Sequence, residues 1–199
     1  HEVVVDTPEH FQVIHDFTIE HLFHVLQVIR DRYDVISSDK DIQYVQIFKN
    51  CGPDSGASIM HSHWQLIGVP MIPREQISIS LRMNQYKQDT GRCILCDMID
   101  YERKKSVRII EETPHFISYS PFASRMSYES DIAVKTHIAS FGQFDDDRIY
   151  ELAHVLNHLL LGTKEIRKEI GYNLCFEDTP KGSDGHWFMR VIPRMGNPA

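Results

Sequence analysis

Residues 48–70 read FKNCGPDSGASIMHSHWQLIGVP, and this stretch combines a glycine-containing turn with a strand. Gly52 and Gly56 can adopt positive φ and allow a backbone to approach a phosphate closely. Residues 43–49 alternate as a half-buried strand before the turn, and residues 60–69 have the composition of a second strand after it. The stretch therefore predicts a strand–turn–strand unit whose turn suits a phosphate.

The second strand carries a row of three polar side chains. His61, His63 and Gln65 occupy alternate positions, so on a strand they face the same way. A neutral imidazole is a competent nucleophile toward phosphorus, and a carboxamide can donate a hydrogen bond to a phosphoryl oxygen. The row predicts phosphoryl chemistry, with metal ligation or structural histidines as the alternative.

Secondary structure on either side of this unit follows from hydrophobic periodicity. Before it, a strand is expected at 2–6 and an amphipathic helix at 18–33. After it, a polar stretch at 82–92 leads to a C-x-x-C pair. The remaining expected elements are strands at 107–110, 116–119 and 131–134, a helix at 146–170, and strands at 172–176 and 187–192.

The order of these elements repeats along the chain. Each half reads strand, histidine, amphipathic helix, strand, and then a strand with a second histidine. His10 precedes His61 by 51 positions, and His137 precedes His186 by 49. Twelve histidines offer some matching pairs by chance, but the shared order of elements favours a duplicated α+β unit.

Four residues of the second half form a candidate zinc set. Cys93 and Cys96 can reach one ion from a tight turn, and His137 and His186 would complete a tetrahedron. The alternative is a redox-active or buried C-x-x-C with unrelated histidines. By the duplication, His10 and His61 are the imidazoles of a matching site whose cysteines we expect upstream of His1.

Composition and charge exclude several classes of protein. The chain has 199 residues, a formal charge of −7 and a pI near 5.9, which argues against a nucleic-acid-coating protein. No apolar run approaches the roughly 18–20 residues that a membrane span needs. A C-x-x-C pair in an acidic chain with no signal peptide fits metal or redox chemistry better than disulfides, so we expect a cytoplasmic protein.

The turn and the H-x-H-x-Q row together resemble a known active-site signature. The pattern is carried by Asn50, Gly56, Ser58, His61, His63 and Gln65. It is similar to the galactose-1-phosphate uridylyltransferase family of the histidine triad superfamily, and HSHWQ and HWF are similar to its ADP-glucose phosphorylase branch. The segments CILC, ETPHFISYSPFASR, KTHIASF and HWFMRVIPR follow in the family's order, so the resemblance covers essentially the whole chain.

The resemblance implies a role for each residue of the signature. His63 would attack the α-phosphorus of a nucleotide sugar and form a covalent nucleotidyl-histidine, and a sugar phosphate or inorganic phosphate would then accept the nucleotide. Gln65 would hydrogen-bond the transferred group, Gly56 and Ser58 would hold the adjacent phosphate, and Asn50 would position the ribose or the phosphates.

The resemblance also implies two metal sites and a dimer. His61 would bind a metal with His10, while the second set, Cys93, Cys96, His137 and His186, would bind Zn²⁺. A homodimer is expected because partner subunits share the sugar site in this family. The chain departs from the family pattern at residue 188, where Phe replaces the second histidine, so only the first half could carry out histidine chemistry.

These observations define one main prediction and two alternatives. We expect an α+β fold of two histidine-triad-like repeats, residues 1–80 and 81–199, each an antiparallel sheet covered by a long helix. The expected function is nucleotidyl transfer from a nucleotide sugar, without nucleic-acid or membrane partners. The alternatives are a histidine-triad hydrolase or dinucleoside polyphosphate phosphorylase, and an inactive zinc-stapled nucleotide-binding module.

Overall fold

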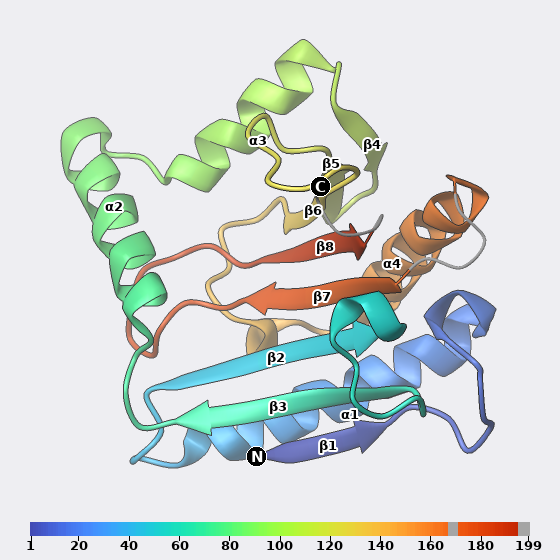
Figure 1. The fold of residues 1–199 in the computed structure, drawn as a ribbon. Coiled ribbons are helices and arrows are strands. Elements are labelled where there is room, and N and C mark those ends of the chain that lie inside the picture. The colour runs from blue at the N-terminus through green and yellow to red at the C-terminus, as the bar shows by residue number, and fades with distance from the viewer. Residues whose placement is uncertain (167–170, 195–199) are drawn as a thin grey trace.

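The computed structural model describes residues 1–166 and 171–194, which include eight strands and four α-helices (Figure 1). The strands are β1 (Glu2–Val5), β2 (Tyr44–Cys51), β3 (His63–Val69), β4 (Ile109–Glu112), β5 (Phe116–Tyr119), β6 (Ser130–Val134), β7 (Gly171–Glu177) and β8 (Phe188–Arg194). The helices are α1 (Ile19–Ser38), α2 (Arg74–Thr90), α3 (Ile94–Lys105) and α4 (Asp146–Ile166). The last residues of the expected helix, 167–170, lie outside the described part.

All eight strands belong to one antiparallel sheet in the order β1-β3-β2-β7-β8-β6-β5-β4. The two halves of the chain meet where β2 pairs with β7, with Asn50 opposite Asn173. The order within the first half, β1-β3-β2, recurs in the second as β6-β8-β7, reflected about the β2–β7 junction. The α+β class expected from the sequence is confirmed.

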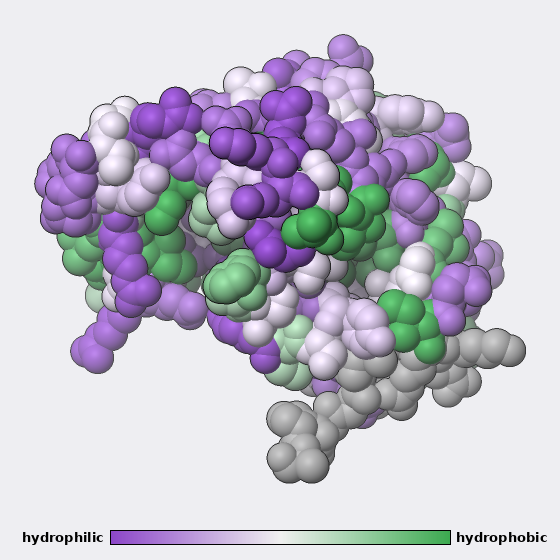
Figure 2. Space-filling model, turned by 90° about the horizontal axis from the view of Figure 1, so that it is seen from above, coloured by the Kyte–Doolittle hydropathy of each residue, from purple (hydrophilic) through white to green (hydrophobic). Residues whose placement is uncertain are grey.

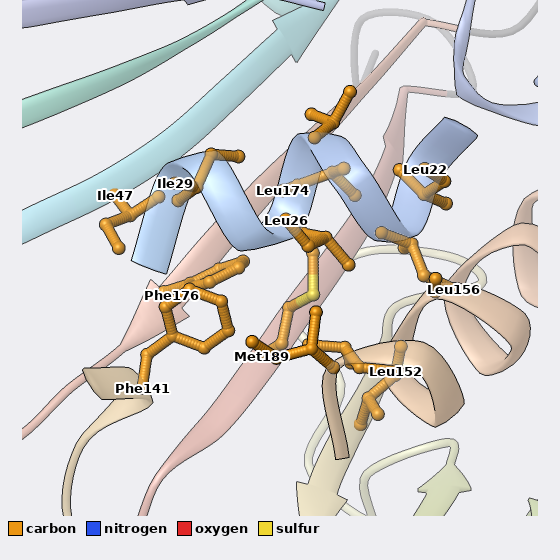
Figure 3. Close-up of a cluster of buried hydrophobic side chains, with 14 of the residues drawn as sticks. Leu22, Leu26, Ile29, Ile47, Phe141, Leu152, Leu156, Leu174, Phe176 and Met189 are labelled. Atoms are coloured by element: carbon orange, nitrogen blue, oxygen red, sulfur yellow. The ribbon is translucent and has the colours of Figure 1, made fainter. Parts of the chain in front are cut away.

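Helices α1 and α4 cover one face of the sheet and bury the main core against it (Figure 1, Figure 3). Helix α1 begins where the Thr18 hydroxyl accepts a hydrogen bond from the backbone N–H of His21, at 3.1 Å. Its apolar residues recur at helical spacing, so a single stripe is buried. The core that this stripe enters includes Leu22, Leu26, Ile29, Ile47, Leu152, Leu156, Leu174, Phe176 and Met189.

The opposite face of the sheet carries α2 and α3 at its sides. Ile99 of α3 packs on Ile117, Tyr119 and Ala133, so α3 covers the β5–β6 end of this face. The helix that packs on β3 in the described residues is α1, which lies on the other face. The end of the molecule that bears α2 and α3 is mostly hydrophilic, with hydrophobic residues in small separate groups (Figure 2).

Two helices were not expected from the sequence. Helix α2 occupies much of the stretch interpreted as a polar connection, and α3 begins at the C-x-x-C pair. Helix α2 buries only Gln76, so it lacks the apolar stripe by which helices are recognised in a sequence. It ends at Gly91, whose φ of +75° is a typical helix stop.

None of the helices in the described residues is long and apolar enough to cross a membrane.

Candidate functional site

His63 is the first residue of β3 and is almost fully buried. Its Nδ1 lies 2.7 Å from the backbone carbonyl oxygen of His61. Because a carbonyl oxygen can only accept, Nδ1 carries the proton, and in the neutral ring the lone pair is therefore on Nε2. His63 is thus held in the tautomer that a nucleophile needs at Nε2.

Strand alternation places His63 and Gln65 on the face that α1 and α4 do not cover. Val5 lies opposite His63, and Val3 lies opposite Gln65. The intervening Trp64 points into the core and is fully buried. Of the predicted row, His61 lies outside the strand, because β3 begins at His63. The strand expected at 60–69 is therefore shorter at its start.

Asn50 lies near the end of β2, where the two halves of the sheet join. Its side-chain oxygen accepts a hydrogen bond from Asn173 Nδ2 at 2.6 Å, and the same nitrogen donates to the Ser55 carbonyl at 2.9 Å. Arg194 Nε donates to the Asn173 side-chain oxygen. Asn50 is therefore part of a polar network that includes a cation from β8.

The loop between β2 and β3 contains both glycines of the signature. Gly52 has φ +81° and Gly56 has φ +79°, the conformation that glycine was expected to allow at these positions. A Cβ on Gly52 would lie 2.8 Å from Gly171 Cα, so close backbone packing also requires glycine there. Gly56 and Ser58 are both exposed on this loop.

Two cavities adjoin the loop and the histidines. One of about 510 Å³ is lined by residues that include Asn50, Gly52, Ile59, His61 and Lys164. The other, of about 320 Å³, is lined by Val3, Val5, Ile59, His61 and His63. The second places His63 beside an apolar surface on the uncovered face of the sheet.

The four candidate zinc ligands of the second half lie together. The ligand atoms of Cys93, Cys96, His137 and His186 are all within 4.8 Å of one another. His186 Nδ1 is 3.7 Å from Cys93 Sγ and 3.4 Å from Cys96 Sγ, and His137 Nδ1 is 3.6 Å from Cys96 Sγ. Tetrahedral bonds of about 2.3 Å to sulfur and 2.0–2.1 Å to nitrogen require S···N separations of about 3.6 Å. The geometry fits a tetrahedral ion.

The outward nitrogens of these histidines are also bound. His186 Nε2 donates to the Val134 carbonyl at 2.6 Å, and His137 Nε2 lies 2.8 Å from an Asp184 carboxylate oxygen. Both imidazoles therefore present Nδ1 to the cluster, as metal-binding histidines do. Burial, and then the adjacent Cys93, raise the pKa of the Cys96 thiol to about 11, and a divalent cation would favour its thiolate.

His10 and His61 form a similar pair in the first half. Their Nδ1 atoms are 3.1 Å apart, and His61 Nε2 lies 2.6 Å from the Thr7 carbonyl oxygen. The ring centroids are 4.8 Å apart at 82°, compared with 5.3 Å and 86° for His137 and His186. The pair has the geometry of two ligands of one ion.

Sequence reasoning missed a buried polar cluster beneath the histidines. Lys49 is fully buried, and its Nζ lies 2.9 Å from Asp6 Oδ2 and 2.8 Å from Ser62 Oγ. The signal was present in the sequence. Lys49 lies on the same face of the strand as Val45 and Ile47, because alternate residues point the same way. It therefore occupies a core-facing position.

Comparisons with known proteins support the family resemblance. Residues 1–72 match the model of the N-terminal domain of a family described as domain of unknown function DUF4931. The chain is 30% identical to ADP-glucose phosphorylase of Arabidopsis thaliana over 98% of this chain and 56% of the relative. It is 27% identical to galactose-1-phosphate uridylyltransferase of Thermotoga maritima over 94% of this chain and 59% of that protein.

The resemblance to galactose-1-phosphate uridylyltransferases is confirmed. Among solved structures, an ADP-glucose phosphorylase from Arabidopsis thaliana with bound ADP-glucose has a TM-score of 0.89 and 28% identity. The match covers 99% of this chain and 64% of that one. The chain thus spans a little over half the length of the curated relatives it matches.

Proposed function

We propose that this chain carries the catalytic histidine of a nucleotidyltransferase acting on nucleoside diphosphate sugars. The observation that supports this most directly is the hydrogen bond from His63 Nδ1 to the His61 carbonyl. It leaves the Nε2 lone pair free, so attack on phosphorus requires no base to remove a proton from the ring.

His63 Nε2 forms a bond to the α-phosphorus while the bond from that phosphorus to the bridging oxygen breaks. The sugar 1-phosphate leaves with the electron pair of the broken bond. A second phosphate, from a sugar phosphate or inorganic phosphate, then takes the nucleotide from His63. The proton stays on His63 Nδ1, hydrogen-bonded to the His61 carbonyl oxygen, throughout both transfers.

Other signature residues act on the phosphates in this proposal. Gln65 donates from its carboxamide to an oxygen of the transferred phosphoryl group as charge builds up. Gly56 and Ser58 hold the neighbouring phosphate at the exposed loop, and Asn50 positions the ribose or phosphates at the β2–β7 junction. A homodimer is the proposed assembly.

The Cys93, Cys96, His137 and His186 cluster would hold Zn²⁺ in a structural role. Two thiolates and two imidazoles fill a tetrahedron, so no position is left for a reactive water. His10 and His61 would supply two ligands to a further metal ion. One ion per chain is expected from the cysteine-containing cluster alone, and two would indicate that the His10–His61 pair is also occupied.

The fold supports two histidine-triad-like repeats, residues 1–80 and 81–199. The strand order β1-β3-β2 of the first half recurs as β6-β8-β7 in the second, which also has β4 and β5, and a long helix follows β1 and β6. Each half also places two histidines at matching points, with the second donating to a backbone carbonyl just after β1 or at the end of β6.

The test is covalent labelling with nucleotide sugars carrying ³²P at the α position. ADP- and UDP-sugars should give an acid-labile label on the wild-type chain, and added phosphate should discharge it as a labelled nucleotide. His63→Asn should remain unlabelled. Label retained in that variant, or no label on the wild type with any of these sugars, would disprove the proposal.

A further inference from the structure

Lys49 is a fully buried ammonium directly behind the nucleophile. Its Nζ donates to Asp6 Oδ2 at 2.9 Å, to Ser62 Oγ at 2.8 Å and to the His63 carbonyl at 3.1 Å. These three acceptors use all three donor positions of an ammonium group. Lys49 thereby links β2, the end of β1 and the backbone of the H-x-H segment.

Burying this charge is costly, since an ammonium loses its hydration in the interior. Burial lowers the pKa of Lys49, and the neighbouring Asp6 opposes that shift. Replacing a buried ion pair by apolar side chains is often neutral or stabilising. A charge retained at such a position is therefore a candidate for function.

The second half shows what the same position looks like without the H-x-H pattern. In the first half, Phe48 of β2 lies opposite Gln65 of β3. In the second half, Cys175 of β7 lies opposite Arg190 of β8 in the same register. The residues that follow, Lys49 and Phe176, therefore occupy equivalent positions. Ser62 and Trp187 are also equivalent, because they directly follow the candidate metal ligands His61 and His186. Phe176 and Trp187 are fully buried, with ring centroids 5.4 Å apart. Where there is no nucleophile, the lysine–serine contact is replaced by an aromatic pair.

We propose that Lys49, with its counterion Asp6, is a positioning residue for His63, an inference that rests on the proposed function. Its bonds hold the Ser62 side chain and the His63 backbone carbonyl, which directly follow His61 in the chain. Held in this way, the segment aims the His61 carbonyl at His63 Nδ1. The nucleophile is thereby held in one tautomer and one orientation before substrate binds.

The test uses Lys49→Met in the full chain, because Met keeps the length of the side chain and removes the charge. We expect the rate of nucleotidyl-His63 formation to fall about 100-fold, the effect of a displacement of about 1 Å, with little change in KM. In ¹⁵N-histidine NMR spectra of the free protein, His63 should lose its single Nδ1–H tautomer. Wild-type rate and wild-type tautomer in this variant would overturn the proposal.

The matched control is Arg108→Met, which removes a cation from the buried Glu102 in the second half. It should change the unfolding temperature without changing the His63 tautomer or the labelling rate. If Lys49→Met does not fold, Ser62→Ala removes one Nζ acceptor and should slow labelling about tenfold. A folded Ser62→Ala with a wild-type rate and tautomer would equally overturn the proposal.

The tautomer measurement also separates this inference from the proposed function. If the wild type forms no nucleotidyl-histidine, the proposed function fails. The NMR spectra still decide whether Lys49 sets the tautomer of His63.

Discussion

Residues 61–65, HSHWQ, and residues 186–190, HWFMR, occupy corresponding places in the two halves of the sheet but differ in chemistry. Both begin with a histidine that donates from Nε2 to a backbone carbonyl. Two positions later, the first half has His63 on an uncovered face, whereas the second has Phe188 packed with the cluster under α3. One framework thus places a histidine on an uncovered face in one half and a packed aromatic side chain in the other.

The C-x-x-C pair lies at the start of α3, the helix that covers the sheet in the second half. Cys93 is the N-cap residue of α3 and Cys96 lies in its first turn, so the cysteine–histidine cluster brings the start of this helix next to His137 and His186. Helix α3 then runs over the β5–β6 end, where Ile99 contacts Tyr119. A bound cation would therefore hold the helix that covers this part of the sheet.

The largest expected effect separates the roles of the two histidines. His63→Asn should lower turnover by at least about 10⁴-fold, as loss of a covalent nucleophile does, while leaving metal content unchanged. His186→Asn should instead lose the metal of the cysteine-containing cluster and lower the unfolding temperature. Turnover assays and metal analysis by plasma mass spectrometry check both. Loss of metal in His63→Asn would contradict the separation.

The second prediction concerns a buried acid that only the second half has. Asp131 lies opposite Arg190, where the first half has Val3 opposite Gln65. Burial, and then the nearby carboxylates Glu129 and Glu177, raise the pKa of Asp131 to about 7, although Arg190 opposes the shift. Since the unfolded pKa is about 3.9, the native state binds the extra proton, and stability falls as pH rises between about 4 and 7.

Asp131→Asn removes this pH dependence. Its stability relative to the wild type should therefore improve from pH 4 to pH 7 by on the order of 3 kcal/mol. Urea denaturation at both pH values measures the difference, and Val3→Asn serves as a control on the other half, with no pH-dependent change expected. A constant difference for Asp131→Asn would show that this carboxyl ionises normally in the native state.

Most of the sheet and the two covering helices could be predicted from the sequence because their burial leaves a periodic pattern. Leu22, Leu26 and Ile29 form one stripe, and each strand predicted in the described residues is present within a few positions. Helix α2 could not be predicted in this way, because its contacts bury a single residue and leave its composition polar. Pattern analysis detects burial, so it misses helices that bury little.

The candidate site could be predicted where chemistry is tied to residue type. The four candidate cysteine and histidine ligands come together as their types and order suggested. Contacts made through backbone atoms leave no such trace, which is why the Lys49 bond to the His63 carbonyl was missed. The Asp184 contact with His137 was missed for a different reason, because surface aspartates are common and their partners depend on the tertiary fold.

The third prediction tests the support of the metal cluster. Asp184→Ala removes the carboxylate that orients His137 through Nε2, so metal affinity should fall about 10- to 100-fold. Competition with a zinc-binding dye measures the affinity. Asp184 also pairs with Lys87, so Lys87→Ala is the control, and it should leave affinity within about twofold. Equal losses in both variants would assign the effect to the Lys87 ion pair.

The smallest expected effect comes from giving the second half the histidine that it lacks. Phe188→His gives an H-x-H spacing with His186, but the new imidazole would lie against Ala133 under α3, with the Arg190 guanidinium beside it. We expect a loss of about 1 kcal/mol in stability, because part of the ring's polarity goes unpaired. We also expect no nucleotidyl label at residue 188 in a His63→Asn background. A label there would mean that α3 does not block access to residue 188. The missing histidine would then be the reason why the second half is not labelled.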